Sequence, residues 1–192
     1  MRKIEINRTT KETEINCVLN IDGSGKYNIS TGIGFLDHML ELFSFHSGFD
    51  LTLDVQGDIE IDSHHTAEDV GLVLGEAILK SVGDKKGINR YGCMHLPMDE
   101  TLARVTLDLS GRPYLVYDCT YQRSDLGTLD VQNIKEFFKS VSNTSLMTLH
   151  LSVLYGENDH HKAEALFKGF GRALKEAVQI TSNQVMSSKG VL

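Results

Sequence analysis

The chain has 192 residues, of which 41% are hydrophobic and 23% charged, and its formal net charge at pH 7 is −7. This length fits one large domain or two small fused ones with a real apolar core. No basic run exceeds Lys85-Lys86, so nucleic acid and anionic membranes are poor partners, although a few clustered cations could bind a small phosphorylated substrate. No segment approaches the roughly 20 apolar residues that a membrane span requires.

The cysteines give an expectation about the cellular compartment. Cys17, Cys93 and Cys119 are odd in number, widely spaced and without a C-x-x-C motif. This pattern favours reduced thiols over a disulfide framework or a zinc ribbon. The first residues, Met1 to Glu5, lack the apolar core of a signal peptide. We therefore expect a cytoplasmic protein.

Hydrophobic periodicity predicts the same series of elements in two parts of the chain. Alternating apolar residues indicate strands, and apolar residues three or four apart indicate helices. The first part is predicted to contain strands at 15–21, 26–30 and 49–55 and helices at 35–45 and 66–82. The second part is predicted to contain strands at 102–109, 114–117 and 147–154 and helices at 131–141 and 162–178. Asp62-Ser63 and Asn158-Asp159 supply cap residues before the long helices.

The two parts also match in their polar residues, which indicates an internal duplication. Offsets between equivalent positions drift from 88 to 98, as small loop insertions would cause. The boundary is expected near Gly87, dividing the chain into residues 1–88 and 89–192 within one compact unit. Hairpins and helices in this order predict an α+β fold, with each half reading β-β-α-β-(β)-α and mixed sheets packed against helices.

One short motif occurs twice. Residues 64–68 read His-His-Thr-Ala-Glu, and residues 160–164 read His-His-Lys-Ala-Glu. On a helix, His64 and Glu68 share a face and can bind one ion, whereas His65 points about 100° away, toward a second ion or a neighbouring chain. An isolated His-His pair is usually a surface or cap feature. Its duplication with a glutamate favours a two-metal site for Mn, Fe or Zn.

Further candidate donors lie outside the motif. His38 begins a predicted helix, and the repeat places Glu136 at the equivalent position, which favours a ligand role for both. Glu12 and Glu100 lead equivalent strands, and Asp99 adjoins Glu100. Any of these carboxylates could act as an acid or a base.

Several scattered cations could bind a phosphate. Arg90, Arg112 and Lys168 offer guanidinium or ammonium groups, and Ser187 and Lys189 lie near the end of the chain. Such donors suit phosphate recognition. Each of these cations, taken alone, is also typical of a solvated surface. The terminal segment is equally typical of a simple tail.

Seven sequence motifs occur in a fixed order along nearly the whole chain. They are residues 8–13, 31–40, 62–69, 86–90, 108–113, 158–168 and 187–192. In this order they resemble the imidazoleglycerol-phosphate dehydratase family, manganese enzymes of histidine biosynthesis. The resemblance implies a duplicated fold like domain 2 of ribosomal protein S5, a cytoplasmic homo-oligomer, and a 24-mer of trimers with active sites between subunits.

The resemblance also implies roles for particular residues. Two Mn²⁺ ions per active site would be bound by His38, His64, His65, Glu68, Glu136, His160, His161 and Glu164. Substrate and phosphate would be bound by Glu12, Arg90, Arg112, Lys168, Ser187 and Lys189. The predicted catalytic residues are Glu12, Glu164 and His65, with Glu12 the best candidate for proton transfer.

The implied reaction removes water from D-erythro-imidazole glycerol phosphate to give imidazole acetol phosphate. The proton that is lost sits on a carbinol carbon with no neighbouring carbonyl, so direct abstraction would be slow. We expect a route through a metal-stabilised imidazolate and a diazafulvene-like species. Two other functions stay open: a dinuclear metallohydrolase acting on a phosphate ester or amide, and a non-enzymatic metal-binding or shell-forming protein.

Overall fold

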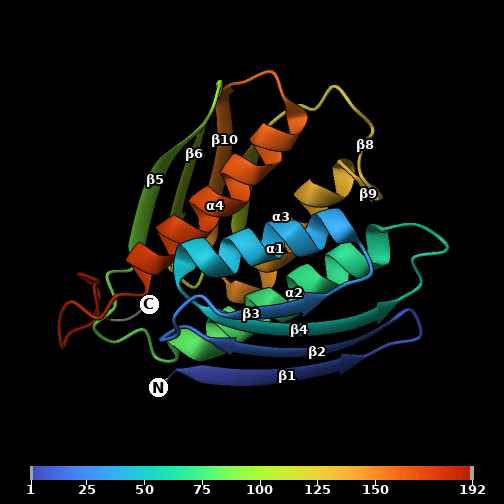
Figure 1. Ribbon diagram of the computed structural model, residues 1–192. Coiled ribbons are helices and arrows are strands. Elements are labelled where there is room, and N and C mark those ends of the chain that lie inside the picture. Colours follow the sequence, from blue (N-terminus) through green and yellow to red (C-terminus); the bar gives the residue numbers. More distant parts are fainter. Residues whose placement is uncertain (1, 191–192) are drawn as a thin grey trace.

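A computed structural model describes residues 2–190 of the chain. Among these residues, two four-stranded sheets form the outer layers, and the helices lie between them (Figure 1). One sheet carries the first part of the chain and the other carries the second part. The predicted α+β class, with mixed sheets packed against helices, is confirmed.

The elements follow one another in closely similar series. The first series is β1 (Lys3–Thr9), β2 (Thr13–Asn20), β3 (Tyr27–Ser30), α1 (Gly34–Ser47), β4 (Asp50–Gly57) and α2 (His64–Val82). The second is β5 (Tyr91–Met98), β6 (Thr101–Asp108), β7 (Tyr114–Asp118), α3 (Gln132–Ser145), β10 (Thr148–Tyr155) and α4 (Asp159–Ala177). A short hairpin, β8 (Asp125–Leu126) and β9 (Leu129–Asp130), is inserted before α3.

The two sheets have the same topology. Their strand orders are β1-β2-β4-β3 and β5-β6-β10-β7. In each sheet the first two pairings are antiparallel and the last is parallel. This correspondence fits a duplicated half, while the predicted boundary between residues 88 and 89 stays a prediction.

Each half begins with a strand that the sequence pattern did not indicate. In β1 only Ile6 is buried, and β5 contains Pro97, which cannot donate a backbone hydrogen bond. Both are edge strands, so they need only one paired side and tolerate weak alternation. Apart from the β8–β9 hairpin, the observed order in each half is therefore β-β-β-α-β-α. The fourth strand begins the half, and within the described residues no strand lies at the optional place predicted between the third strand and the last helix.

The helices join the halves through one apolar core. Helix α2 packs on α3 and α1 packs on α4, so each helix pair combines one helix from each half. Phe43 of α1 stacks on Phe170 of α4 with ring centroids 5.3 Å apart, and Phe137 stacks on Phe167 at the same separation. Among residues 2–190, no helix is long and apolar enough to cross a membrane.

Candidate active site

The clearest cluster of candidate metal ligands combines the two halves. His38 in the second turn of α1 meets His160 and Glu164 at the start of α4. Their donor atoms all lie within 4.8 Å of one another, and within residues 2–190 this is the one group of three such donors with that spacing. Metal–ligand bonds of about 2.0–2.2 Å would place donors at most ~4.4 Å apart, so small side-chain shifts suffice. The donor set fits a transition metal.

Glu164 is held in its ionised form by its neighbours. It is 6% exposed, its Oε2 lies 3.0 Å from Nε2 of His160, and its other oxygen forms an ion pair with Lys168. Burial raises the pKa of Glu164, but the hydrogen bonds and charges of Lys168 and His160 together outweigh this effect and lower it. An ionised carboxylate beside an imidazole is the form that binds a metal.

The equivalent positions of the other helix pair are less converged. His64 and Glu68 begin α2, and Glu136 lies on α3. Glu136 is paired with Lys139 at 2.7 Å, and the same lysine also feels the charge of Glu68. His64, Glu68 and Glu136 therefore share one face of the α2–α3 pair, but their donor atoms do not reach the spacing of the first cluster.

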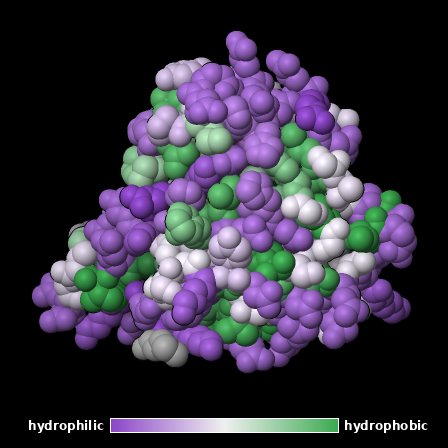
Figure 2. Space-filling view, viewed as in Figure 1, coloured by the Kyte–Doolittle hydropathy of each residue, from purple (hydrophilic) through white to green (hydrophobic). Residues whose placement is uncertain are grey.

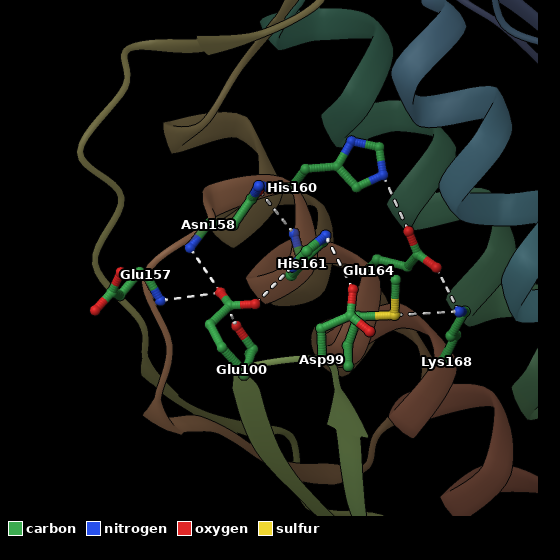
Figure 3. Close-up of polar contacts among 10 residues, drawn as sticks. Asp99, Glu100, Glu157, Asn158, His160, His161, Glu164 and Lys168 are labelled. Atoms are coloured by element: carbon green, nitrogen blue, oxygen red, sulfur yellow. Dashed lines mark hydrogen bonds and ion pairs between the residues drawn. The ribbon is translucent and has the colours of Figure 1, made fainter.

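The second histidine of each motif turns away from the first, as the helix geometry predicts. Nδ1 of His65 lies 2.9 Å from Asp58 and 3.9 Å from Glu12. Nδ1 of His161 lies 2.7 Å from Glu100, and its Nε2 lies 3.7 Å from Asp99. Figure 3 shows His161 directed toward these two carboxylates. The hydrogen bonds that the carboxylates of Asp58 and Glu100 accept from these rings raise the pKa values of His65 and His161 respectively.

Glu100 is held firmly by the loop before α4. Its Oε1 accepts hydrogen bonds from the backbone N–H groups of Glu157 and Asn158 and from the hydroxyl of Thr101. The N–H of Asn158 first, and then His161, lower the pKa of Glu100 well below its usual value. Glu100 is therefore a structural acceptor that stays ionised, not a free base.

Glu12 has a different environment at the tip of the β1–β2 hairpin. Its side chain is 55% exposed, and the one ionic contact described for it is the 3.9 Å approach to His65. The hairpin is fixed to α2 because Arg8 and Thr13 both bind Asp69, at 3.0 and 2.5 Å. A rigid hairpin thus presents a free carboxylate beside the first motif.

Three of the predicted phosphate-binding residues gather far from the first metal-ligand cluster. The backbone N–H of Arg90 binds the carbonyl of Ala177 at the end of α4, and its guanidinium forms two bonds to Asp108 and one to the carbonyl of Met186. The segment with Ser187 and Lys189 lies just beyond Met186, and Lys189 N–H binds the Ser187 hydroxyl at 3.2 Å.

The other two predicted phosphate ligands are placed differently. Arg112 is exposed in the β6–β7 loop, at the same end of the second sheet as Arg90, because Leu109 N–H binds the carbonyl of Arg90. Lys168 lies along α4, between the two ends, paired with Glu164. The predicted phosphate ligands of one chain therefore do not form a single site within that chain.

Two residues that contact the motif histidines were not predicted from the sequence. Asp58 binds His65, and the side-chain oxygen of Asn133 accepts a hydrogen bond from Nδ1 of His64 at 3.0 Å. Asp58 follows β4 in a loop with no counterpart of equal length in the second half. Asn133 is one helical turn before Glu136, so a search for polar residues on that helix face could have found it.

The helix starts that carry the motifs are capped in two ways. Asn158 accepts hydrogen bonds from the N–H groups of His160 and His161, as predicted for a cap residue. Before α2, Asp62 accepts from His64 N–H at 2.7 Å, whereas the Ser63 side chain makes no cap bond and binds Asn133 instead. Both arrangements fix the first turn from which the histidines project.

Comparison with known proteins decides the family. The family model for imidazoleglycerol-phosphate dehydratase matches residues 31–174, a span that contains both motifs and His38. The chain belongs to the imidazoleglycerol-phosphate dehydratase family. Members of this family are hydro-lyases, and membership implies a place in histidine biosynthesis.

Relatives with the same name match along the full chain. The imidazoleglycerol-phosphate dehydratase of Clostridioides difficile (strain 630) is 54% identical over 192 residues, covering 100% of both chains. That of Caldicellulosiruptor bescii is 56% identical over 191 residues, covering 100% of this chain and 98% of the relative.

Solved structures of the family have the same fold. The Staphylococcus aureus subsp. aureus N315 imidazoleglycerol-phosphate dehydratase superimposes with a TM-score of 0.85 at 43% identity, covering 93% of this chain and 99% of that one. The Pyrococcus furiosus structure, solved in complex with (S)-C348, gives a TM-score of 0.85 at 38% identity, covering 97% and 100%.

Proposed function

We propose that the chain catalyses the dehydration of D-erythro-imidazole glycerol phosphate to imidazole acetol phosphate in L-histidine biosynthesis. Family membership supports this reaction, and one observation on the structure of this chain supports it independently. His38, His160 and Glu164, contributed by both halves, place their donor atoms within 4.8 Å of one another, as a metal-dependent dehydratase would need. The proposal includes a cytoplasmic location, in keeping with three free cysteines in the described chain.

The proposal includes two Mn²⁺ ions per active site. His38, His160 and Glu164 would hold one ion, and the remaining five predicted ligands would complete the set: His64, His65, Glu68, Glu136 and His161. Imidazole and carboxylate donors suit manganese. When bound, the metal would act as a Lewis acid that favours the deprotonated imidazole ring of the substrate. The route through a diazafulvene-like species stays a prediction.

The chain's own residues would then bind the substrate and move its protons. Glu12 would take the carbinol proton, because its carboxylate is exposed and lies beside His65. Glu164 and His65 would fix the reacting end, and cations from the far end of α4 would hold the phosphate. Binding the remote phosphate orients the substrate for the reaction.

Distances within one chain support the predicted assembly with active sites between subunits. His160 and Ala177 are the start and end of α4, seventeen residues apart, so they lie roughly 25 Å apart at about 1.5 Å per residue. Arg90, Ser187 and Lys189 lie near Ala177, whereas the metal-ligand cluster lies near His160. A substrate with a short glycerol chain cannot join these ends, so a neighbouring subunit would supply one of them.

Exposed apolar side chains next to both motifs further support the assembly. Ile59 and Ile61 precede the first motif and are 46% and 67% exposed. Leu154 and Tyr155 precede the second motif and are 43% and 63% exposed. Figure 2 shows that the face in view is mainly hydrophilic, with apolar residues interspersed. Exposed apolar side chains grouped beside a polar site are consistent with a subunit interface. The stoichiometry that we propose, a 24-mer of trimers, is the one that the family resemblance implies.

Two measurements on the same preparation test the proposal. Purified protein loaded with Mn²⁺ should convert imidazole glycerol phosphate to a ketone without releasing phosphate. Size exclusion with metal analysis of the same peak should give a large oligomer that contains manganese. Phosphate release would instead favour a metallohydrolase, and a monomer without manganese would contradict both the assembly and the site.

A further inference from the structure

The second histidine of each motif has its Nδ1 atom bound to a carboxylate. In the second half the partner is Glu100, which follows β5, at 2.7 Å. In the first half the partner is Asp58, which follows β4, at 2.9 Å. The same contact is thus made by residues from different loops.

The repeat makes this difference informative. Glu12 is the counterpart of Glu100, since both precede the second strand of their sheet: Thr13 begins β2 and Thr101 begins β6. Yet Glu12 stands 3.9 Å from His65, beyond hydrogen-bonding distance. In the first half, Asp58 makes the contact that the repeat would assign to Glu12.

Loop length explains where that residue comes from. Six residues separate β4 from α2, whereas three separate β10 from α4. The shorter loop places the N–H groups of Glu157 and Asn158 on Glu100. The longer loop brings Asp58, only 15% exposed on its side chain, under His65 instead.

We propose that Asp58 is the positioning residue of His65, in the role that Glu100 has for His161, and that this exchange leaves the Glu12 carboxylate free at the active site. The inference rests on the proposed metal site. A carboxylate on Nδ1 holds the proton there, so Nε2 carries the lone pair that a metal requires. It also fixes the ring plane. Asp58 acts through His65 and touches neither metal nor substrate.

Replacing Asp58 tests the first part of this proposal. Asp58→Ala removes the acceptor, Asp58→Asn keeps an oxygen that can accept from Nδ1–H, and Glu60→Ala removes an exposed acid from the same loop as a charge-matched control. Mn²⁺ affinity is measured by calorimetry at fixed pH. We expect about a 10- to 100-fold loss for Asp58→Ala, the usual range for such partners, a smaller loss for Asp58→Asn, and no change for Glu60→Ala. Equal affinities for Asp58→Ala and Glu60→Ala would overturn the proposal.

A second readout does not depend on metal. Long-range ¹⁵N–¹H spectra of the metal-free protein report which nitrogen of His65 is protonated. Wild type, Asp58→Asn and Glu12→Gln should show the Nδ1–H form, and Asp58→Ala a mixture. Wild type with mainly Nε2–H would refute the positioning role. If wild type shows Nδ1–H but binds no Mn²⁺, the proposed metal site fails while the positioning of His65 stands. If Asp58→Ala does not fold, the spectra of wild type and Asp58→Asn still show whether Nδ1 of His65 carries the proton.

Discussion

The two halves of the molecule share their framework and differ in how their carboxylates are used. Both present a motif of two histidines and a glutamate at the start of a long helix, and both sheets have the same strand order. In the second half, Glu100 is bound by two backbone N–H groups and a histidine, whereas its counterpart Glu12 is exposed. The duplicated framework holds the histidines, and the loops decide which acid is free to react.

The largest expected effect separates these two glutamates. Glu12→Gln should lower kcat by roughly 10²- to 10⁴-fold, the range for removing a general base. Manganese content should stay at the wild-type level, because Glu12 is not among the predicted ligands. Steady-state kinetics and metal analysis of one preparation check this. Normal turnover would remove Glu12 from the mechanism.

The matched variant in the other half is Glu100→Gln. Because Glu100 is fully engaged with the loop before α4, we expect its replacement to act on stability and on His161 rather than on proton transfer. The kcat of Glu100→Gln should therefore fall far less than that of Glu12→Gln. Equal losses would mean that the two halves contribute equivalent acids after all.

A second comparison concerns His38 and Glu136, the equivalent ligands of the two helix pairs. His38 is already within 4.8 Å of two other donors, while Glu136 is paired with Lys139. Removing an engaged ligand should cost more affinity, so His38→Ala should weaken Mn²⁺ binding more than Glu136→Ala. The loss for His38→Ala should be at least tenfold, by analogy with outer-shell partners whose loss costs about 10- to 100-fold. Calorimetric titration of both variants decides, and the reverse order would contradict the comparison.

The sequence predicted the helices and central strands because their apolar faces are buried and strictly periodic. It missed β1 and β5 because edge strands bury few side chains, as with Ile6 in β1. The motif histidines could be predicted because metal binding depends on the residue types and on their spacing along a helix, and both can be read from the sequence. Asp58 was not predicted, because its contact with His65 depends on a loop length that no local pattern encodes. Asn133 could have been found only by searching the helix face that carries Glu136. The predicted ligand and phosphate residues remain predictions, although the structure places several of them together.

The helix pairs offer a test of equivalence in packing. A Cβ atom on Gly75 would lie 2.6 Å from the carbonyl oxygen of Val141 on α3, and one on Gly171 would lie 2.8 Å from that of Phe43 on α1. Overpacking of this kind costs about 1–3 kcal/mol. Gly75→Ala and Gly171→Ala should therefore each lower the free energy of unfolding by this amount in denaturant titrations. Gly34→Ala, where a Cβ meets nothing within 4 Å, is the control. If one of these two variants keeps the wild-type stability, its helix pair is not tightly packed at that glycine, and the two pairs are not equivalent.

The smallest expected effect is the pH dependence of the stability that Glu100 contributes in the second half. The lowered pKa of Glu100 adds stability at pH values above about 4.5 that is lost as the pH falls through its folded pKa. The raised pKa of His161 adds stability below about 6.5 that is lost as the pH rises through its folded pKa. Wild type should therefore exceed Glu100→Gln in stability most clearly between about pH 4.5 and 6.5, measured by denaturant titration of metal-free protein. At lower pH the gap should close, because Glu100 becomes protonated in wild type. At higher pH it should narrow without closing, because neutral His161 still donates to Glu100 and the two backbone N–H bonds to its carboxylate remain. If the difference in unfolding free energy between wild type and Glu100→Gln does not change with pH, the charge of Glu100 does not stabilise the loop. Glu100 and Glu12 would then differ in exposure and not in the use of their charge.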